Sequence, residues 1–534
     1  QVVELLVCLP HGRSLQRELI EKRIIDLKNG YRQNIAIIGD ELVGKTSLIF
    51  NFIRNFSDPH ILPLYLEVRP EPFKDFKRRF MGVLLYAFLD NSSISLQENL
   101  DFLIEKSRNF IPKTADKITD LLRNPVSKKK ADNFFELLEV CDLIYQESGK
   151  RCVVIWDEFH NLEYMGIKTL YAEWSKALIT HKNTMFIITS SLPSKAKKIL
   201  AHNLSLLFGN FQSISLEPFD VHTSEVYLDI KFEGNHLDKG LRNFLVHFSG
   251  GYPFYLNLLS EGMLKHEKMP LTQVLVELLF SSTGILNQRF NNYLKRLVSL
   301  PNSQDYLSLL YSIASGHNRL KDIMHISHKT AKEINVRLNY LLELDVVTRS
   351  GDFFKINDRL FGFWLKFVYQ KKANALTFDA KNQKQHFTSY LDVVIKEFIV
   401  SSAKPIPERM IELLRLFEDD IIQVEEKKFR LNHFRELKQL EFNSRGLGEG
   451  VLGRSEDSVW IMAFKNKKLT EEDVTEFARE CKKYRNKLQQ KIIISLDEID
   501  INARLRALDE KILTWGLSQV NELMDLYAKP RIVT

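Results

Sequence analysis

Apolar segments that alternate with helical patterns mark the first 220 or so residues of the chain. Four of them predict strands, at residues 34–38, 151–156, 184–188 and 213–216. The seven residues 47–53 place their apolar side chains at helical spacing, so a helix follows the first strand. Near-continuous apolar runs such as 151–156 are typical of parallel strands buried on both faces. This region is therefore predicted to be an α/β domain.

The pattern changes after residue 222. Residues 223–295 show helical spacing with few glycines and predict a small helical domain. Residues 303–370 predict three helices and a hairpin, the elements of a winged helix, at 305–315, 320–326, 331–344, 346–349 and 353–356. Ser350-Gly351-Asp352 forms the hairpin turn, and Thr330 caps the third helix.

Helices and strands alternate again near the end of the chain. Lys371–Lys384 is polar and charged and predicts a linker. Residues 385–534 then predict helices, three strands, a helix, a strand and a further helix, which indicates a second α/β domain. The predicted domains are therefore 1–222, an α/β core; 223–300, a helical lid; 301–370, a winged helix; and 385–534, a C-terminal α/β domain.

The loop between the first strand and its helix carries the most specific motif. Residues 39–46 read Gly-Asp-Glu-Leu-Val-Gly-Lys-Thr, the pattern G-x-x-x-x-G-K-T in a strand–loop–helix context. Glycines let successive N–H groups converge on phosphate oxygens, and the helix adds its positive end. Lys45 can reach the β- and γ-phosphates, and the Thr46 hydroxyl can ligate Mg²⁺. The predicted binding residues for ATP or ADP are Gly39, Asp40, Glu41, Leu42, Val43, Gly44, Lys45, Thr46 and Ser47.

Two carboxylates end the next predicted strand. Asp157 and Glu158 follow the run 151–156, and active sites of open α/β sheets lie at the carboxyl ends of strands. We expect this strand to neighbour the first one. Asp157 would then hold Mg²⁺, and Glu158 would accept the proton of the attacking water.

Two further positions are candidates with open alternatives. Ser190, or Ser191 beside it, follows the strand 184–188 and could contact the γ-phosphate; an ordinary polar strand end is the alternative. Pro253 follows Gly250-Gly251-Tyr252, a sharp helix start that could press against an adenine; a simple turn between helices is the alternative.

The composition disfavours some classes of protein. Hydrophobic residues make up 44% of the 534, and no stretch is long enough to span a bilayer, so we expect no membrane contact. The apolar run at Val2–Leu9 is too short for a secretion signal. The four cysteines form neither a metal-binding pair nor a disulfide framework, which favours a reducing, cytoplasmic setting. The net charge of +7 permits acidic or nucleic-acid partners without requiring one.

The order of these motifs resembles the archaeal-type ATPases of the STAND branch of the AAA+ superfamily, over about residues 10–370. The matching segments are Gly12-Arg13, Glu18-Leu19, Gly44-Lys45-Thr46-Ser47-Leu48, Asp157-Glu158-Phe159, Thr189-Ser190-Ser191 and Gly250-Gly251-Tyr252-Pro253. Two departures stand out. Phe208-Gly209-Asn210 lies where the family often has Gly-Arg, which implies slow hydrolysis, and His160 replaces a usual glutamine.

The two accessory domains carry weaker chemistry. Lys329, Lys332, Arg337, Arg349 and Lys355 could face DNA, although in this family the module often packs against the lid. The C-terminal domain resembles the restriction-endonuclease-like fold. An active member of that fold carries one metal-binding acid near the position of Gly450 and a Glu at the position of Ala463, two residues before Lys465. Gly and Ala stand there in this sequence, so both acids are missing. Glu449 is next to the first position, but its side chain is expected on the opposite face of the strand.

The sequence thus favours a Mg²⁺-dependent, ATP-hydrolysing switch of the STAND type, with an inactive nuclease-like domain. Two alternatives stay open: a DNA-processing ATPase, and a scaffold that holds nucleotide structurally. A guanine-reading Asn-Lys-x-Asp motif is absent after Asp157, which disfavours GTP. A protein partner or self-association is expected for the output of such a switch.

Overall fold

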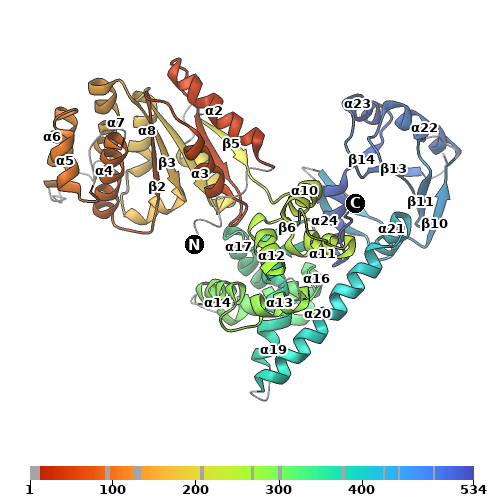
Figure 1. The fold of residues 1–534 in the computed structure, drawn as a ribbon. Helices are drawn as coiled ribbons and strands as arrows, with labels where there is room; N and C mark the ends of the chain where they lie inside the picture. Colours follow the sequence, from red (N-terminus) through yellow and green to blue (C-terminus); the bar gives the residue numbers. More distant parts are fainter. Residues whose placement is uncertain are drawn as a thin grey trace. The chain divides into compact units, whose positions relative to one another are not determined.

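The chain forms two compact units, residues 1–218 and 219–534, each described by itself. The structure is a computed structural model (Figure 1). It describes residues 12–90, 97–123, 134–204, 210–265, 270–298, 303–374, 379–424, 427–442, 446–484 and 488–533. Val2–Leu9 and Cys8, named above, lie outside these residues, as do Phe208 and Gly209.

The first unit is built on a five-stranded parallel sheet with the order β2-β3-β4-β1-β5. Its strands are β1 (Asn34–Ile38), β2 (Ile61–Glu67), β3 (Arg151–Asp157), β4 (Thr184–Ser190) and β5 (Phe211–Ser215). The predicted α/β class is confirmed. The expectation that the acid-bearing strand neighbours the P-loop strand is wrong, because β4 lies between β1 and β3. The carboxyl ends of all three strands still meet at one edge.

Helices cover both faces of this sheet (Figure 1). One face packs with the core of α4 to α8, where Trp156 contacts the rings of Trp174 and Phe186. The helices α2 and α3 lie on the other side, and α3 begins directly at the end of the P-loop. Their bounds are α2 (Ser14–Lys28), α3 (Lys45–Asn55), α4 (Phe73–Leu89), α5 (Leu100–Ser107), α6 (Pro112–Arg123), α7 (Phe134–Ser148), α8 (Leu170–Thr180) and α9 (Pro193–Lys198).

The second unit opens with the helices of the predicted lid. These are α10 (Val221–Lys231), α11 (Lys239–Ser249), α12 (Pro253–Lys265), α13 (Leu271–Leu279) and α14 (Ile285–Val298). The long helix α20 (Ala380–Ser402) packs on α11 and α13, through Phe398 against Phe244 and through Thr272 bonded to Asp392. The linker prediction for Lys371–Lys384 is therefore wrong at both ends. α19 (Gln370–Ala373) and the first turns of α20 are helical, because the apolar face that starts at Phe387 anchors a helix whose first turns are polar.

Three helices and a hairpin follow the lid helices. They are α15 (Ser303–Ala314), α16 (Leu320–Ser327), α17 (Ala331–Glu343), β6 (Val347–Ser350) and β7 (Phe353–Ile356). We call them the hairpin module. Thr330 and Glu333 form a capping box at the start of α17. A short helix, α18 (Arg359–Trp364), then leads back to the lid, where the Trp364 indole donates to Asn287 Oδ1 at 2.9 Å.

The C-terminal domain, residues 406–533, holds a second sheet of mixed direction. Its order is β10-β11-β12-β13-β14; β10 to β12 run antiparallel, and β12 to β14 run parallel. A separate hairpin, β8–β9, precedes it. The elements are α21 (Ile406–Leu414), β8 (Asp420–Val424), β9 (Lys427–Leu431), β10 (Glu436–Glu441), β11 (Glu449–Arg454), β12 (Val459–Lys465), α22 (Glu471–Cys481), β13 (Leu488–Ser495), α23 (Ile501–Asp509), β14 (Leu513–Trp515) and α24 (Leu517–Leu526).

None of the helices in the described ranges combines the length and the apolar composition that crossing a bilayer requires.

Candidate functional site

The P-loop runs from the end of β1 into the first residue of α3. Gly44 adopts φ +96° at the N-cap of α3, a conformation that favours glycine. Leu42 also has positive φ, at +68°. Gly39 is required for a different reason. A Cβ at this position would lie 2.0 Å from the carbonyl oxygen of Leu216, which follows β5. The start of the P-loop is thus packed closely against the residue that follows β5, and its end leads directly into α3.

Lys45 and Thr46 meet the acids of β3 at this edge. The Lys45 ammonium donates to the carbonyl oxygens of Gly39 and Asp40 at 2.9 and 2.8 Å. The Thr46 hydroxyl donates to Asp157 Oδ2 at 2.8 Å, although the two residues are 111 positions apart. Lys45 is buried, so desolvation lowers the pKa of its ammonium, while the carboxylates of Glu158 and Asp157 act in the opposite direction. The structure therefore places a buried cation, a hydroxyl and two acids together.

Asp157 has two more partners that the sequence did not indicate. The Tyr65 hydroxyl from β2 donates to Asp157 Oδ2 at 2.8 Å, and the Thr189 hydroxyl from β4 donates to Oδ1. Burial and the adjacent carboxylate of Asp157 raise the pKa of Tyr65. Both hydroxyls come from strands beside β3, and only the strand order could have identified them. They fix the orientation of the carboxylate in the arrangement that binds Thr46.

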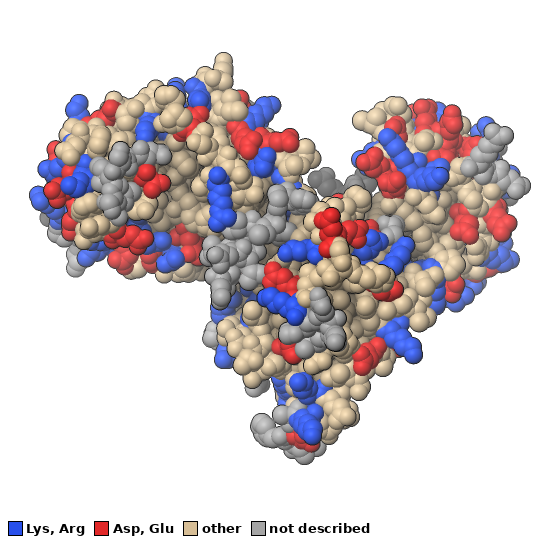
Figure 2. Space-filling view, in the orientation of Figure 1, with Lys and Arg blue, Asp and Glu red and all other residues tan. Residues whose placement is uncertain are grey.

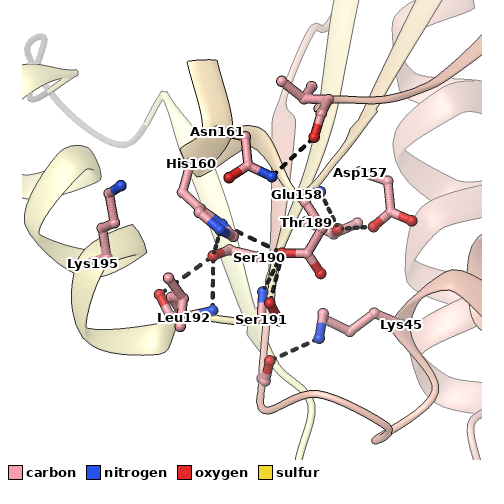
Figure 3. Close-up of polar contacts among 12 residues, drawn as sticks. Lys45, Asp157, Glu158, His160, Asn161, Thr189, Ser190, Ser191, Leu192 and Lys195 are labelled. Atoms are coloured by element: carbon pink, nitrogen blue, oxygen red, sulfur yellow. Dashed lines mark hydrogen bonds and ion pairs between the residues drawn. The ribbon is translucent and has the colours of Figure 1, made fainter. Parts of the chain in front are cut away.

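Glu158 is held by the end of β4 (Figure 3). The backbone N–H and the hydroxyl of Ser191 each donate to Glu158 Oε2 at 2.8 Å. Glu158 itself adopts φ +58°, a left-handed conformation that is uncommon for a residue with a side chain. Burial raises the pKa of the Glu158 carboxyl above its ordinary value, against the opposing effects of Lys45 and Ser191. Strained backbone and a basic, oriented carboxylate are features of functional sites.

Ser190 lies beside this carboxylate but points to a histidine. Its hydroxyl is 2.9 Å from His160 Nδ1, accepts from the N–H of Leu192 at 3.1 Å and can donate to the Leu192 carbonyl at 3.3 Å (Figure 3). His160 is buried and lies in the short 3₁₀ helix Phe159–Met165 that follows Glu158. The His160 ring therefore connects the ends of β3 and β4, and its Nδ1 lies 3.3 Å from Glu158 Oε2.

The buried His160 should make the free energy of unfolding fall in acid. Burial, reinforced by Lys195, lowers the pKa of His160 to about 4, whereas the unfolded chain has the ordinary value of 6.5. The unfolded state then binds more protons, so this stability is complete above pH 6.5 and is lost as the pH falls toward 4. Between pH 7 and pH 5 we expect wild type to lose about 1 to 2 kcal/mol more than His160→Gln. Urea unfolding at both pH values measures this, and equal losses in the two proteins would contradict it.

The remaining predicted residues fall in different places. Asp40 is half-buried, Glu41 is exposed, and Val43 and Ser47 are buried in the loop and the first turn of α3. Pro253 begins α12 and belongs to the second unit, so its role at the nucleotide stays a prediction. Arg13, from the Gly12-Arg13 pair, donates to the carbonyl oxygen of Glu217 and, at 3.4 Å, to that of Val43 in the P-loop.

The positions expected to carry nuclease acids lie opposite each other in the C-terminal sheet. Gly450 of β11 pairs in register with Ala463 of β12. A Cβ on Gly450 would lie 2.3 Å from the ring of Phe442, which packs edge-on against Phe477. Lys465 pairs with Asp473 at 2.8 Å and donates to the Gly446 carbonyl at 3.0 Å. Aromatic side chains thus fill the space beside Gly450. Across the described residues, no three His, Cys, Asp or Glu side chains are grouped as a metal site.

Comparison with known proteins concerns the fold alone. No protein-family model and no curated protein matches the chain. Among solved structures, a Walker-type ATPase of Pyrococcus abyssi is 18% identical, with a TM-score of 0.49, over 68% of this chain and 99% of that one. The ORC2 protein of Aeropyrum pernix, in ADPNP–ADP complexes, is 12% identical, with a TM-score of 0.42, over 68% and 96%. The Cdc6p protein of Pyrobaculum aerophilum is 10% identical, with a TM-score of 0.33, over 74% and 96%. The first unit itself has a parallel α/β sheet with a P-loop sequence between β1 and α3.

Proposed function

We propose that this chain is a Mg²⁺-dependent ATP-binding and ATP-hydrolysing switch of the STAND type. One observation carries the proposal. Lys45 and Thr46 at the start of α3 converge with Asp157 at the end of β3 and with Glu158 directly after it, through a 2.8 Å bond between Thr46 and Asp157. A helix N-terminus, a buried ammonium and two acids are the set that phosphoryl transfer from a nucleotide needs.

The residues present fit Mg²⁺ and a triphosphate. The Thr46 hydroxyl and the Asp157 carboxylate would hold the ion, because hydroxyl and carboxylate oxygens are the ligands that Mg²⁺ prefers. The ion would neutralise charge that develops on the phosphates. Lys45 now donates to two loop carbonyls, and it would exchange these bonds for bonds to phosphate oxygens. Tyr65 and Thr189 would keep the Asp157 carboxylate in place during this exchange.

Glu158 is proposed as the base for the attacking water. Ser191 donates two bonds to Glu158 Oε2, which orients the carboxylate. Burial raises the pKa of Glu158 and so makes it a better proton acceptor, provided that it remains ionised beside Lys45. Ser190 is proposed to contact the γ-phosphate. It would then have to give up part of its bonding with His160 and Leu192.

The switch itself involves the second unit. We propose that Pro253 contributes to nucleotide binding and that the C-terminal domain reports the bound state. Phosphate release by the full chain in Mg-ATP, compared with the same assay in EDTA, tests the activity. Steady Mg²⁺-dependent release supports the proposal. Nucleotide that stays bound without turnover favours a scaffold that holds nucleotide structurally.

A DNA-processing ATPase is the second candidate function. The hairpin module has the three helices and the two-stranded hairpin of a winged helix, which supports this alternative. On the face shown in Figure 2, however, basic and acidic side chains are interspersed. The net charge of +7 is modest for a chain of 534 residues. ATP turnover that rises on addition of duplex DNA would favour this alternative over a switch.

The C-terminal domain is proposed to be a nuclease-like domain without nuclease activity. We expect the full chain to leave plasmid and single-stranded DNA uncut in Mg²⁺ or Mn²⁺, because Gly450 and Ala463 supply no carboxylate and Phe442 occupies the adjoining space. Agarose gels of both substrates measure this, with Lys465→Ala as the matched control. Metal-dependent cutting that Lys465→Ala abolishes would contradict the prediction. It would mean that Glu449, Glu456 or Asp457 binds the metal.

A further inference from the structure

The hairpin module presents its turn and several basic side chains to one neighbour, the C-terminal domain. We define the hairpin face as the turn Ser350–Asp352 together with Arg319, Lys321 and Lys355. Arg and Lys side chains and backbone N–H groups are the groups that commonly contact the phosphates of nucleic acids. In this structure, the segment Glu418–Gln423 covers the turn, and Asp525 of α24 faces Lys355.

Backbone pairing fixes the turn to strand β8. The N–H of Asp352 donates to the carbonyl of Ile421 at 2.8 Å, and the N–H of Ile421 donates to Asp352 Oδ2 at 2.8 Å. The Ser350 hydroxyl donates to the Gln423 carbonyl at 3.1 Å. Gly351 adopts φ +60°, and a Cβ there would lie 2.1 Å from the Ile421 carbonyl oxygen. β8 therefore covers the turn and occupies the backbone N–H of Asp352.

Carboxylates of the C-terminal domain also form ion pairs with the basic side chains of the hairpin face. Arg319 binds Glu418 at 2.7 Å and Asp420 at 3.0 Å, and its guanidinium lies over the ring of Phe353. Lys321 lies 3.2 Å from Glu418 and 3.6 Å from Asp420. Lys355 lies 3.8 Å from Asp525. Three acids of the C-terminal domain thus take the place that phosphates would take on this face.

The basic residues of α17 are engaged within the module. Lys329 and Arg337 both pair with Asp305 of α15. Arg349 donates to the Gly351 carbonyl at 2.8 Å. Lys332 is exposed on α17. The helix that the sequence suggested as the DNA-binding helix therefore has two of its three basic side chains paired inside the module, whereas the cations of the hairpin face pair with acids of another domain.

We propose that the hairpin face binds the backbone of duplex DNA, and that the C-terminal domain of the same chain occupies it as a built-in competitor. The apparent affinity for DNA is then reduced by the fraction of molecules in which the face is free. The ion pairs of this contact differ in how far their side chains are exposed to solvent. Lys321 and Glu418 keep 56% and 58% of their side chains exposed, whereas Arg319 and Asp420 keep 12% and 4%. Phe353, also in this contact, packs in the core of the C-terminal domain, so freeing the face requires this apolar contact to separate.

The test measures binding of a fluorescent 20-base-pair duplex of random sequence by the full chain, using anisotropy at low salt. Glu418→Ala/Asp420→Ala should bind at least about tenfold more tightly than wild type, with an affinity that falls steeply as salt rises. Glu471→Ala/Glu472→Ala, which removes two exposed acids of α22, makes the same change in net charge and should bind like wild type. Adding Lys321→Ala/Lys355→Ala to the first variant should return the affinity to the wild-type level.

Several results would overturn the proposal. They are tight binding by wild type, no gain in a folded Glu418→Ala/Asp420→Ala protein, an equal gain in the α22 control, or a gain that survives loss of Lys321 and Lys355. A preference for single-stranded RNA over the duplex would overturn the choice of partner. If thermal unfolding shows that the Asp420 change prevents folding, the single variant Glu418→Lys provides the test. It should also bind the duplex more tightly than wild type, and it should fold because that side chain is 58% exposed.

Discussion

Lys45→Ala is expected to remove most of the stabilisation that Mg-ATP or Mg-ADP gives to this protein. A ligand at 100 times its dissociation constant stabilises the state that binds it by about 2.7 kcal/mol. The Lys45 ammonium is buried, and it is bonded to the P-loop carbonyls of Gly39 and Asp40. Without it, the phosphate charge would lack its main counter-ion. Thermal unfolding with and without saturating nucleotide measures the gain for each protein.

A matched control separates this effect from a general change in charge. Lys22→Ala removes the same charge from the exposed face of α2, and it should keep the full gain in stability on adding nucleotide. Unfolding without nucleotide shows whether Lys45→Ala still folds. If a folded Lys45→Ala protein gained as much stability from nucleotide as wild type does, the phosphates would bind elsewhere.

Glu158→Gln is expected to keep nucleotide binding and to lower ATP turnover by a factor on the order of 100 to 10,000, the usual contribution of a general base. The amide can still accept from Ser191, whose N–H and hydroxyl now bond to Glu158 at 2.8 Å. It cannot accept a proton from water. Phosphate release and fluorescent-nucleotide binding, measured on the same preparation, distinguish the two effects. Glu105→Gln, an exposed change on α5, should leave both unchanged.

The contrary outcome is informative in its own right. Normal turnover by Glu158→Gln would show that another group takes the proton, and His160 or Ser190 beside it would be the next candidates. Loss of binding together with turnover would show that Glu158 supports the loop structurally, through its contact with the end of β4.

Local motifs predicted the P-loop well, and the reason is its short range. Residues 39–46 and the helix after them are contiguous, so the sequence alone placed Lys45 at the start of a helix. The need for Gly39 could not be seen this way, because it depends on the Leu216 carbonyl 177 residues away. Thr46 and Asp157 were each identified by type, yet their contact depends on a strand order in which β4 separates β1 from β3.

The residues that sequence reasoning missed are those whose role comes from neighbouring strands. Tyr65 belongs to no motif, and Thr189 was noted only as part of the segment Thr189-Ser190-Ser191. Their contact with Asp157, through the two hydroxyls, was not foreseen. Ser191 was considered for a phosphate, whereas its described bonds go to Glu158. The docking of the hairpin turn on β8 was equally hidden, because Gly351 and Ile421 are far apart in the chain and neither segment has a distinctive pattern.

Nucleotide binding at the P-loop is tested most directly by a calorimetric titration of the full wild-type chain with ATP in Mg²⁺. We expect saturable binding of one nucleotide per chain, competition by ADP but not by GTP, and a marked loss of affinity in EDTA and in Lys45→Ala. Absence of binding at millimolar ATP, or binding that Lys45→Ala leaves unchanged, would contradict this expectation.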